Sequence, residues 1–207
     1  MRSKYLLFLA LLILVSCKKE IRTLSDYNKY LNDMDHGLKK ERTFNNLKIG
    51  VKLLPPDYLL LKEINSIAKE SYSKKLSEYQ KSLSFLLTLT FGDGKAEAGN
   101  NPVAFGVNDY QEYKERFIHL NFELYEDIKL VLDNKEEYTP VLISFENTYG
   151  QGDALNTTIV FSPKKDKTEF VKTSSYTFVY NDRIYSTGLN KFTFKKEDLE
   201  NSPHINI

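Results

Sequence analysis

The feature of this chain that most limits its fold is a series of short runs in which apolar and polar side chains alternate. A period of two places one set of side chains on one face of a β-strand. Strands at this spacing, with turn residues between them, predict an antiparallel sheet or a small β-sandwich. In the C-terminal half, an immunoglobulin-like arrangement of these strands is one form that fits the pattern. The five runs after residue 127 are IKLVLD, VLISFENTY, TTIVFS, SYTFVY and KFTF.

The first half of the chain predicts three more strands. GLKKERTFNNLKIGVKLLPP indicates two strands that meet at the Asn45-Asn46 turn, and SFLLTLTFG indicates a buried central strand. The alternating residues expected on the buried faces are Leu47, Ile49, Val51, Leu53, Phe85, Leu87, Leu89 and Phe91.

Three segments have apolar residues at helical spacing. A short helix is expected to begin at Ser25 or Asp26 and to stop at Gly37, which suits a left-handed helix end. A longer helix of about seven turns is expected from the N-cap Asp57 to Leu83. A third helix is expected over 109–121, with Tyr110, Tyr113, Phe117, Leu120 and Leu124 on its apolar face.

We expect these elements to share one α+β core, in which two to three amphipathic helices pack with the sheets. The chain has 14 Tyr and 13 Phe among 207 residues, and aromatic side chains favour strands. No linker interrupts the sequence after residue 37, so a single domain over 26–207 is predicted, strand-rich from about residue 127. The single cysteine excludes an intramolecular disulfide, so packing alone must hold the fold.

The N-terminus has the layout of a secretory signal peptide. Arg2 and Lys4 precede an apolar run from Tyr5 to Val15, and this run is shorter than the roughly 20 residues that span a bilayer core. We therefore expect residues 1–16 to be a signal peptide that is removed.

The signal ends in Leu14-Val15-Ser16-Cys17, which resembles the bacterial lipobox. That resemblance implies that Cys17 becomes the first mature residue and carries a diacylglyceryl thioether, with a further acyl chain such as palmitate on its amine. Each buried methylene contributes about 0.8 kcal/mol, so two or three chains hold a protein almost permanently at a membrane. Residues 17–25 are then a lipidated tether.

The segment Cys17-Lys18-Lys19-Glu20 and the composition of the chain resemble uncharacterised lipoproteins of the Bacteroidota. Lys18, rather than Asp, follows the cysteine, and this favours the outer membrane in a two-membrane cell. The resemblance predicts a cell-envelope protein at the outer membrane, on its periplasmic or its surface face.

Charge excludes one class of partner. The chain has 29 basic and 28 acidic residues, a balance that lacks the positive footprint of nucleic-acid-binding proteins. The expected partners are the membrane, through acyl chains on Cys17, and another envelope protein.

No residue pattern predicts a catalytic, cofactor or metal site. In the loop GDGKAEAG, Lys95 is followed by Ala96 rather than by Ser or Thr, so the loop does not match a phosphate-binding loop and is expected to be a polar connection. The neighbouring Asp33, Asp35 and His36 are typical of a helix end. The three histidines, His36, His119 and His204, are far apart and form no metal-binding pair.

Two classes of function follow. The first is a non-catalytic, lipid-anchored binding or structural module for an envelope protein or a small ligand, which includes an immunity-type inhibitor. The alternative is a lipid-anchored envelope hydrolase whose active site is not visible in the sequence. The hydrolase requires a cleft with convergent polar groups.

Lipidation at Cys17 can be tested directly. Substituting Cys17→Ala removes the thiol that accepts the diacylglyceryl group, so we expect an uncleaved or mislocalised precursor. Mass spectrometry of the N-terminal peptide of the wild-type protein should show acylated Cys17. An unmodified thiol in the mature protein would refute the assignment.

Overall fold

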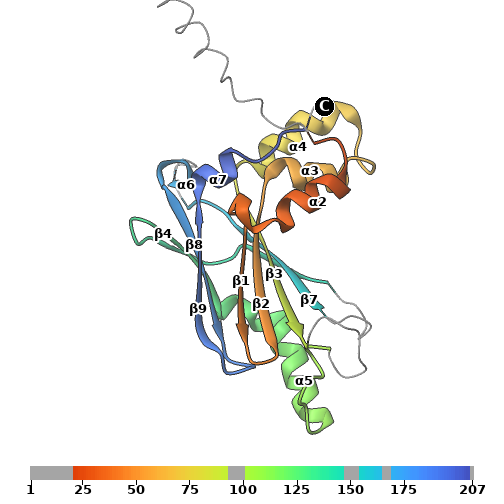
Figure 1. The fold of residues 1–207 in the computed structure, drawn as a ribbon, viewed down its shortest axis with the longest axis vertical. Coiled ribbons are helices and arrows are strands. Elements are labelled where there is room, and N and C mark those ends of the chain that lie inside the picture. Colours follow the sequence, from red (N-terminus) through yellow and green to blue (C-terminus); the bar gives the residue numbers. More distant parts are fainter. Residues whose placement is uncertain (1–20, 93–100, 147–153, 165–168, 206–207) are drawn as a thin grey trace, which may run out of the picture.

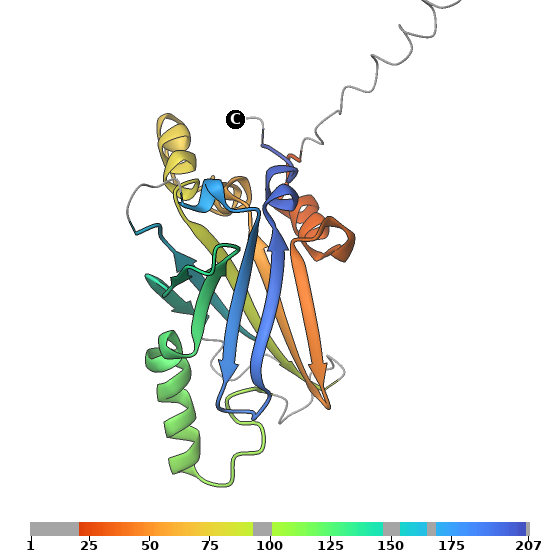
Figure 2. The same ribbon diagram turned by 90° about the vertical axis from the view of Figure 1, so that its left-hand side faces the viewer.

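Two antiparallel sheets face each other in the computed structural model, and helices lie at both ends of the pair (Figures 1 and 2). The structure describes residues 21–92, 101–146, 154–164 and 169–205. Cys17 and most of the GDGKAEAG loop lie outside these ranges. The α+β class and the β-sandwich with helices are confirmed.

The first sheet has five strands in the order β1-β2-β3-β7-β6. Its strands are β1 (Lys39–Phe44), β2 (Leu47–Leu54), β3 (Leu83–Phe91), β7 (Ala154–Phe161) and β6 (Leu142–Phe145).

The second sheet has four strands in the order β5-β4-β8-β9. Its strands are β5 (Glu137–Tyr138), β4 (Ile128–Leu132), β8 (Ser175–Asp182) and β9 (Gly188–Lys195). The sandwich draws on both halves of the chain. Its strand orders, with the β1-β2-β3 meander in one sheet, differ from the ABED and CFG sheets of an immunoglobulin domain.

The predicted hairpin around Asn45-Asn46 is confirmed. β1 and β2 pair antiparallel up to Phe44 and Leu47, and Asn45 has a positive φ of 50°, which asparagine tolerates better than most residues. The predicted inward residues of β2 are all buried, because the alternation matches the strand period.

β3 is the central strand, as the sequence predicted. It pairs with β2 on one side from Ser84 to Phe91 and with β7 on the other from Leu83 to Thr90. The exposed fraction of its side chains Phe85, Leu87, Leu89 and Phe91 does not exceed 3%.

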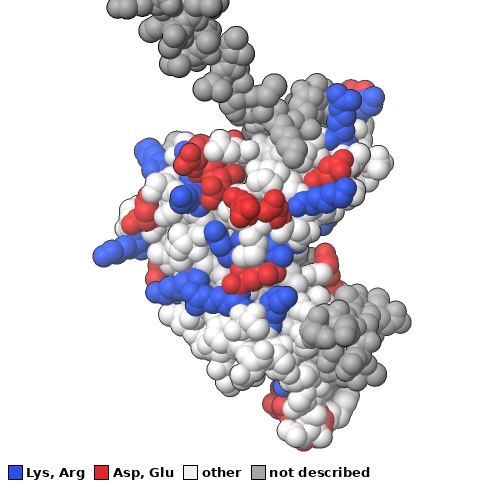
Figure 3. Space-filling model, viewed as in Figure 1, with Lys and Arg blue, Asp and Glu red and all other residues white. Residues whose placement is uncertain are grey.

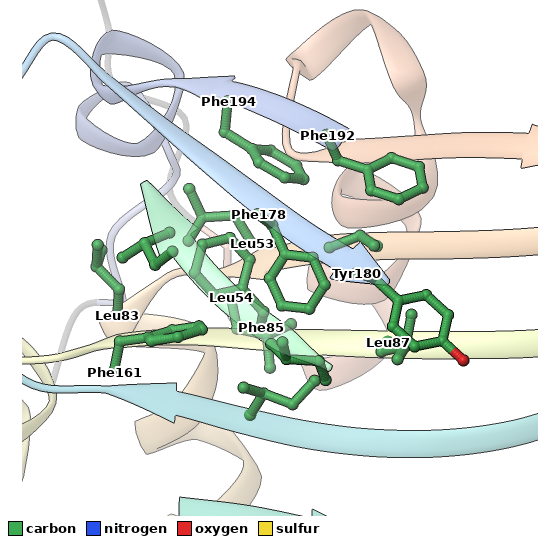
Figure 4. Packing of buried hydrophobic residues seen from close by; sticks show 14 of the residues in the cluster. Leu53, Leu54, Leu83, Phe85, Leu87, Phe161, Phe178, Tyr180, Phe192 and Phe194 are labelled. Atoms are coloured by element: carbon green, nitrogen blue, oxygen red, sulfur yellow. The ribbon is translucent and has the colours of Figure 1, made fainter. Parts of the chain in front are cut away.

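A cluster of phenylalanines joins the two sheets (Figure 4). The ring of Phe85 on β3 lies 5.2 Å from Phe178 on β8 and 5.6 Å from Phe194 on β9, between ring centroids. Phe161 on β7 lies 5.8 Å from Phe85. All four side chains are fully buried. Burying a ring of this size contributes roughly 1.5 to 3 kcal/mol, and aromatic pairs add about 1 kcal/mol.

The first predicted helix forms, but its cap was misassigned. α2 spans Leu24–Asn32, and a 3₁₀ turn, η2, continues it over Met34–His36 to Gly37, whose φ of 74° ends it as predicted. The N-cap is Thr23 rather than Ser25 or Asp26. Thr23 is extended, and its hydroxyl oxygen accepts the Asp26 N–H at 3.1 Å.

The single long helix predicted from Asp57 to Leu83 is wrong. The segment forms α3 (Pro56–Glu63), the 3₁₀ turn η3 (Lys69–Ser71) and α4 (Tyr72–Tyr79). The break lies at Ser66, whose N–H and hydroxyl both donate to the Glu63 carbonyl at 2.8 Å. These bonds compete with helix continuation. Asp57 is not the N-cap, because Pro55 holds that position.

The third predicted helix is confirmed as α5 (Tyr110–Ile118), and the carboxylate of Asp109 caps it by accepting the Glu112 N–H at 2.8 Å. A π-helical turn, η4 (His119–Glu123), and a 3₁₀ turn, η5 (Leu124–Glu126), follow it.

The two ends of the sandwich differ. α2, α3, α4, α6 (Glu169–Lys172) and α7 (Lys196–Glu200) cover one end, and α5 lies at the other (Figure 1). The Ile21 N–H donates to the His204 carbonyl at 3.5 Å, so the first described residue lies at the helix-rich end beside the C-terminal segment. Among the described residues, no helix is long and apolar enough to cross a membrane.

The phenylalanine cluster yields a stability prediction. Phe85→Ala should lower the free energy of unfolding by about 3 to 5 kcal/mol, because it leaves a cavity between the sheets. Phe122→Ala, at a ring that is 70% exposed, is the control and should change it by less than about 0.5 kcal/mol. Chemical denaturation measures both, and equal losses would contradict this account of the core.

Candidate functional site

Exposed aromatic rings gather on α5 and the two turns after it. Tyr110 is 77% exposed, Phe122 70%, Tyr125 54% and Tyr113 36%. We call these four residues the aromatic surface. Of the eleven large hydrophobic residues exposed in the described part of the chain, seven lie here or on adjoining segments. The other three of the seven are Ile118, Val141 and Leu142.

The aromatic surface is partly ordered by its own contacts. The rings of Tyr110 and Tyr113 are 6.5 Å apart and inclined by 23°, and those of Tyr113 and Phe117 are 6.3 Å apart and inclined by 21°. Phe117 is half-buried and packs against the main core. Because Tyr110 and Tyr113 already stack in a row with Phe117, ordering these two rings on binding costs less side-chain entropy.

Helical spacing placed all five apolar residues of this helix on one face, but only part of that face is buried. Leu120 and Leu124 are at most 1% exposed, whereas Tyr110 and Tyr113 are not buried. A place on the apolar face of this helix therefore does not bury these two tyrosines. Figure 1 shows the reason: α5 projects past the ends of the strands, so its first turns have no sheet to cover them.

Asp127 holds the turns after α5 in place. Its side chain is 1% exposed, and one of its oxygens lies 2.5 Å from Nε2 of His119, while the other lies 2.6 Å from Nε of Arg183. Nδ1 of His119 lies 3.2 Å from Glu123. The network thus ties the π-helical turn to the connection after β8. Such turns occur often at functional sites.

α5 itself is clamped to the segment before it. The Arg116 guanidinium donates to the Phe105 carbonyl at 2.5 Å and lies 5.3 Å from the centre of the Tyr185 ring. The Tyr185 hydroxyl donates to the Pro102 carbonyl at 2.6 Å. Burial raises the pKa of Tyr185 above its usual value, so this hydroxyl stays a donor. These contacts fix the direction in which the aromatic surface points.

Charge around the aromatic surface is acidic. Residues 109–127 contain six acidic and two basic side chains. Figure 3 shows one face of the whole molecule, on which charged side chains gather in the upper part, while the part between them and α5 is largely uncharged. An apolar centre with an acidic rim is an arrangement typical of a protein-binding surface.

The three histidines have different surroundings in the structure. His36 stacks on Tyr30 with ring centroids 3.7 Å apart, His119 lies in the Asp127 network, and His204 lies at the helix-rich end. Asp33 accepts the Asp35 N–H at 3.0 Å, so the predicted capping role at this helix end is confirmed. The described ranges contain no group of three or more side chains placed to bind a metal.

A second site, which sequence reasoning missed, is a cavity of about 510 Å³ at the helix-rich end. Asp57 and His204 meet on its wall, 147 positions apart in sequence, with Nδ1 of His204 3.3 Å from the carboxylate. The Ile205 N–H donates to the other oxygen of Asp57 at 3.0 Å. No sequence signal links two single residues at this separation.

The Asp57–His204 pair resembles part of a hydrolytic triad, which also needs a hydroxyl beside the imidazole. Two serines line the cavity. The Ser82 hydroxyl donates to the Tyr79 carbonyl at 3.3 Å, and the Ser202 hydroxyl donates to the Leu199 carbonyl at 2.7 Å. Both hydroxyls therefore donate their hydrogen bonds to backbone carbonyls at helix ends rather than to the imidazole of His204.

Comparison with known proteins leaves the family open. No family model matches the chain. Over 122 residues it is 27% identical to the "Replication factor C small subunit" of Methanocaldococcus jannaschii, an alignment that covers 59% of this chain and 6% of that protein.

Two solved structures are similar at low scores. A DUF4426 family protein from Pseudomonas aeruginosa PAO1 has a TM-score of 0.35 and 8% identity, covering 77% of this chain and 93% of its own. A protein of unknown function from Burkholderia pseudomallei K96243 has a TM-score of 0.37 and 11% identity, covering 90% and 95%. Scores this low carry no argument about fold or function.

The Asp127 network predicts a large difference between two neighbouring acids. Asp127→Asn removes a buried carboxylate from its contacts with the His119 imidazole and the Arg183 guanidinium, and should lower the free energy of unfolding by about 2 kcal/mol. Glu126→Gln also removes a contact to Arg183, but Glu126 is 49% exposed, so less than about 1 kcal/mol should be lost. Urea denaturation compares them, and equal losses would disprove the anchoring role of Asp127.

Proposed function

We propose that this chain is a lipid-anchored protein of the cell envelope that binds another envelope protein through the aromatic surface, without catalysis. The observation that carries the proposal is the position of that surface. It lies on α5 and the two turns after it, and α5 projects from the end of the sandwich opposite Ile21 (Figure 1).

The geometry suits anchoring at Cys17. Only three residues, Lys18 to Glu20, separate Cys17 from Ile21, and the four peptide steps between them span at most about 14 Å. Acyl chains on Cys17 would therefore hold the helix-rich end near the bilayer, with α5 directed away from it. The proposed location is the outer membrane, on its periplasmic or surface face.

The chemistry of the surface describes the partner. Tyrosine and phenylalanine are enriched at the centres of protein interfaces, where they fill pockets on the other protein. The acidic residues of 109–127 favour a partner with basic residues around such a pocket. A nucleic acid, which is itself anionic, is not a suitable ligand for this surface.

The alternative of a lipid-anchored hydrolase rests on Asp57 and His204. It is less well supported because both serines of that cavity donate to carbonyl groups rather than to the imidazole. An activity screen with the His204→Ala variant as control separates the two functions. Turnover that this substitution abolishes would favour the hydrolase.

Photo-crosslinking in intact cells tests the binding function. A photoreactive amino acid at position 122 should form an adduct with one protein, and the same group at position 34 should not. Met34 is a suitable control because it is 51% exposed at the opposite end. The partner is then identified by mass spectrometry and purified.

Affinity for the purified partner should fall about tenfold or more in Phe122→Ala, the range expected for an aromatic residue at an interface centre. Met34→Ala should leave it unchanged. Adducts that form equally from both positions, or affinity that Phe122→Ala does not change, would count against the proposal.

A further inference from the structure

We propose that the cavity at the helix-rich end binds an amphiphile with an anionic head group and an apolar chain. This goes beyond protein binding by the aromatic surface, since it concerns the other end of the molecule. The chemistry of the ligand follows from the cavity itself, whereas a membrane as its source rests on the proposed anchoring at Cys17.

The cavity has the size and wall of a small-molecule site. Its volume of about 510 Å³ lies within the range of ligand-binding cavities, roughly 300 to 1,000 Å³. Leu83, Phe170 and Tyr176 line it and belong to the buried core, so one wall is rigid and apolar. Val171, also in the lining, is 61% exposed. An apolar chain lying on this wall would cover Val171.

The charges of the lining favour an anion. Of its two carboxylates, Asp57 is satisfied by His204 and the Ile205 N–H, and Glu200 pairs with Lys196 at 2.9 Å. The lining also contains Lys81, whose ammonium has no acidic partner within the part of the chain that the structure describes. Among the described lining residues, the Lys81 ammonium is thus the cation placed to meet an anionic head group.

The cavity lies beside the first described residue. His204 lines it, and the His204 carbonyl accepts the Ile21 N–H. A chain anchored at Cys17 would therefore hold this cavity within a short tether of the bilayer surface, where acyl chains with phosphate or carboxylate head groups are abundant. Both phospholipids and free fatty acids have this chemistry.

Photolabelling of the full-length protein in vesicles tests the proposal. Vesicles of neutral phospholipid receive one photoreactive probe at a time: a fatty acid, a phosphatidylglycerol or a phosphatidylcholine. At least one anionic probe should label peptides that line the cavity, around Phe170 or Leu199, about fivefold more than the phosphatidylcholine does. The anionic probe that labels more strongly identifies the source of the ligand.

Two variants with matched controls locate the site. Val171→Asp places a negative charge in the lining and Lys81→Ala removes the cation, so each should reduce labelling about fivefold, the order of one charge contact near a surface. The controls lie far from the cavity. Leu189→Asp, at a side chain 57% exposed, and Lys114→Ala on α5 should leave labelling unchanged.

The outcomes separate this proposal from anchoring. Mass spectrometry of the Cys17 peptide is run on the same samples, and the fatty acid is also offered in solution below its micelle concentration. Acylated protein whose cavity is unlabelled, or labelled equally by all three probes, overturns the cavity proposal. Unacylated protein that the fatty acid labels at the cavity supports it and refutes only the anchoring.

Discussion

The packing of Phe85 against Phe178 and Phe194 is the contact on which the rest of the structure depends. β3 carries Phe85 and pairs with β2 and β7 along nearly all of its length, so it organises the first sheet. Phe85 then joins that sheet to the second. Because the chain has a single cysteine and so no intramolecular disulfide, this packing alone holds the two sheets together. The ends of the packed strands then position the helices and loops that follow them.

Both candidate sites lie at these strand ends. At one end, α3, α6 and α7 contribute to a cavity whose floor is the core itself. At the other, α5 projects beyond the sheets (Figure 2), and aromatic side chains on it and on the turns after it are exposed. A chain tethered at the first end would present the second, and this division of one sandwich into a membrane side and a partner side underlies both proposals.

The part of the fold that could be predicted is the part that local pattern controls. Alternation identified β2 and β3 because side chains with a period of two share one face of a strand. Gly37 ended the first helix because glycine readily adopts the positive φ that a helix end of this kind requires. The break at Ser66 was missed. Its apolar neighbours keep helical spacing on both sides, while two hydrogen bonds to Glu63 redirect the chain.

By itself, the sequence determined the class of the fold, most of its strands and the motif at Cys17, all of which are written in short stretches of chain. Only the tertiary structure decided which faces are buried. The spacing of Tyr110 and Tyr113 shows that they share a helix face, but burial depends on a neighbouring sheet that ends before it reaches them. The meeting of Asp57 with His204 likewise arises from long-range packing, for which no local pattern exists.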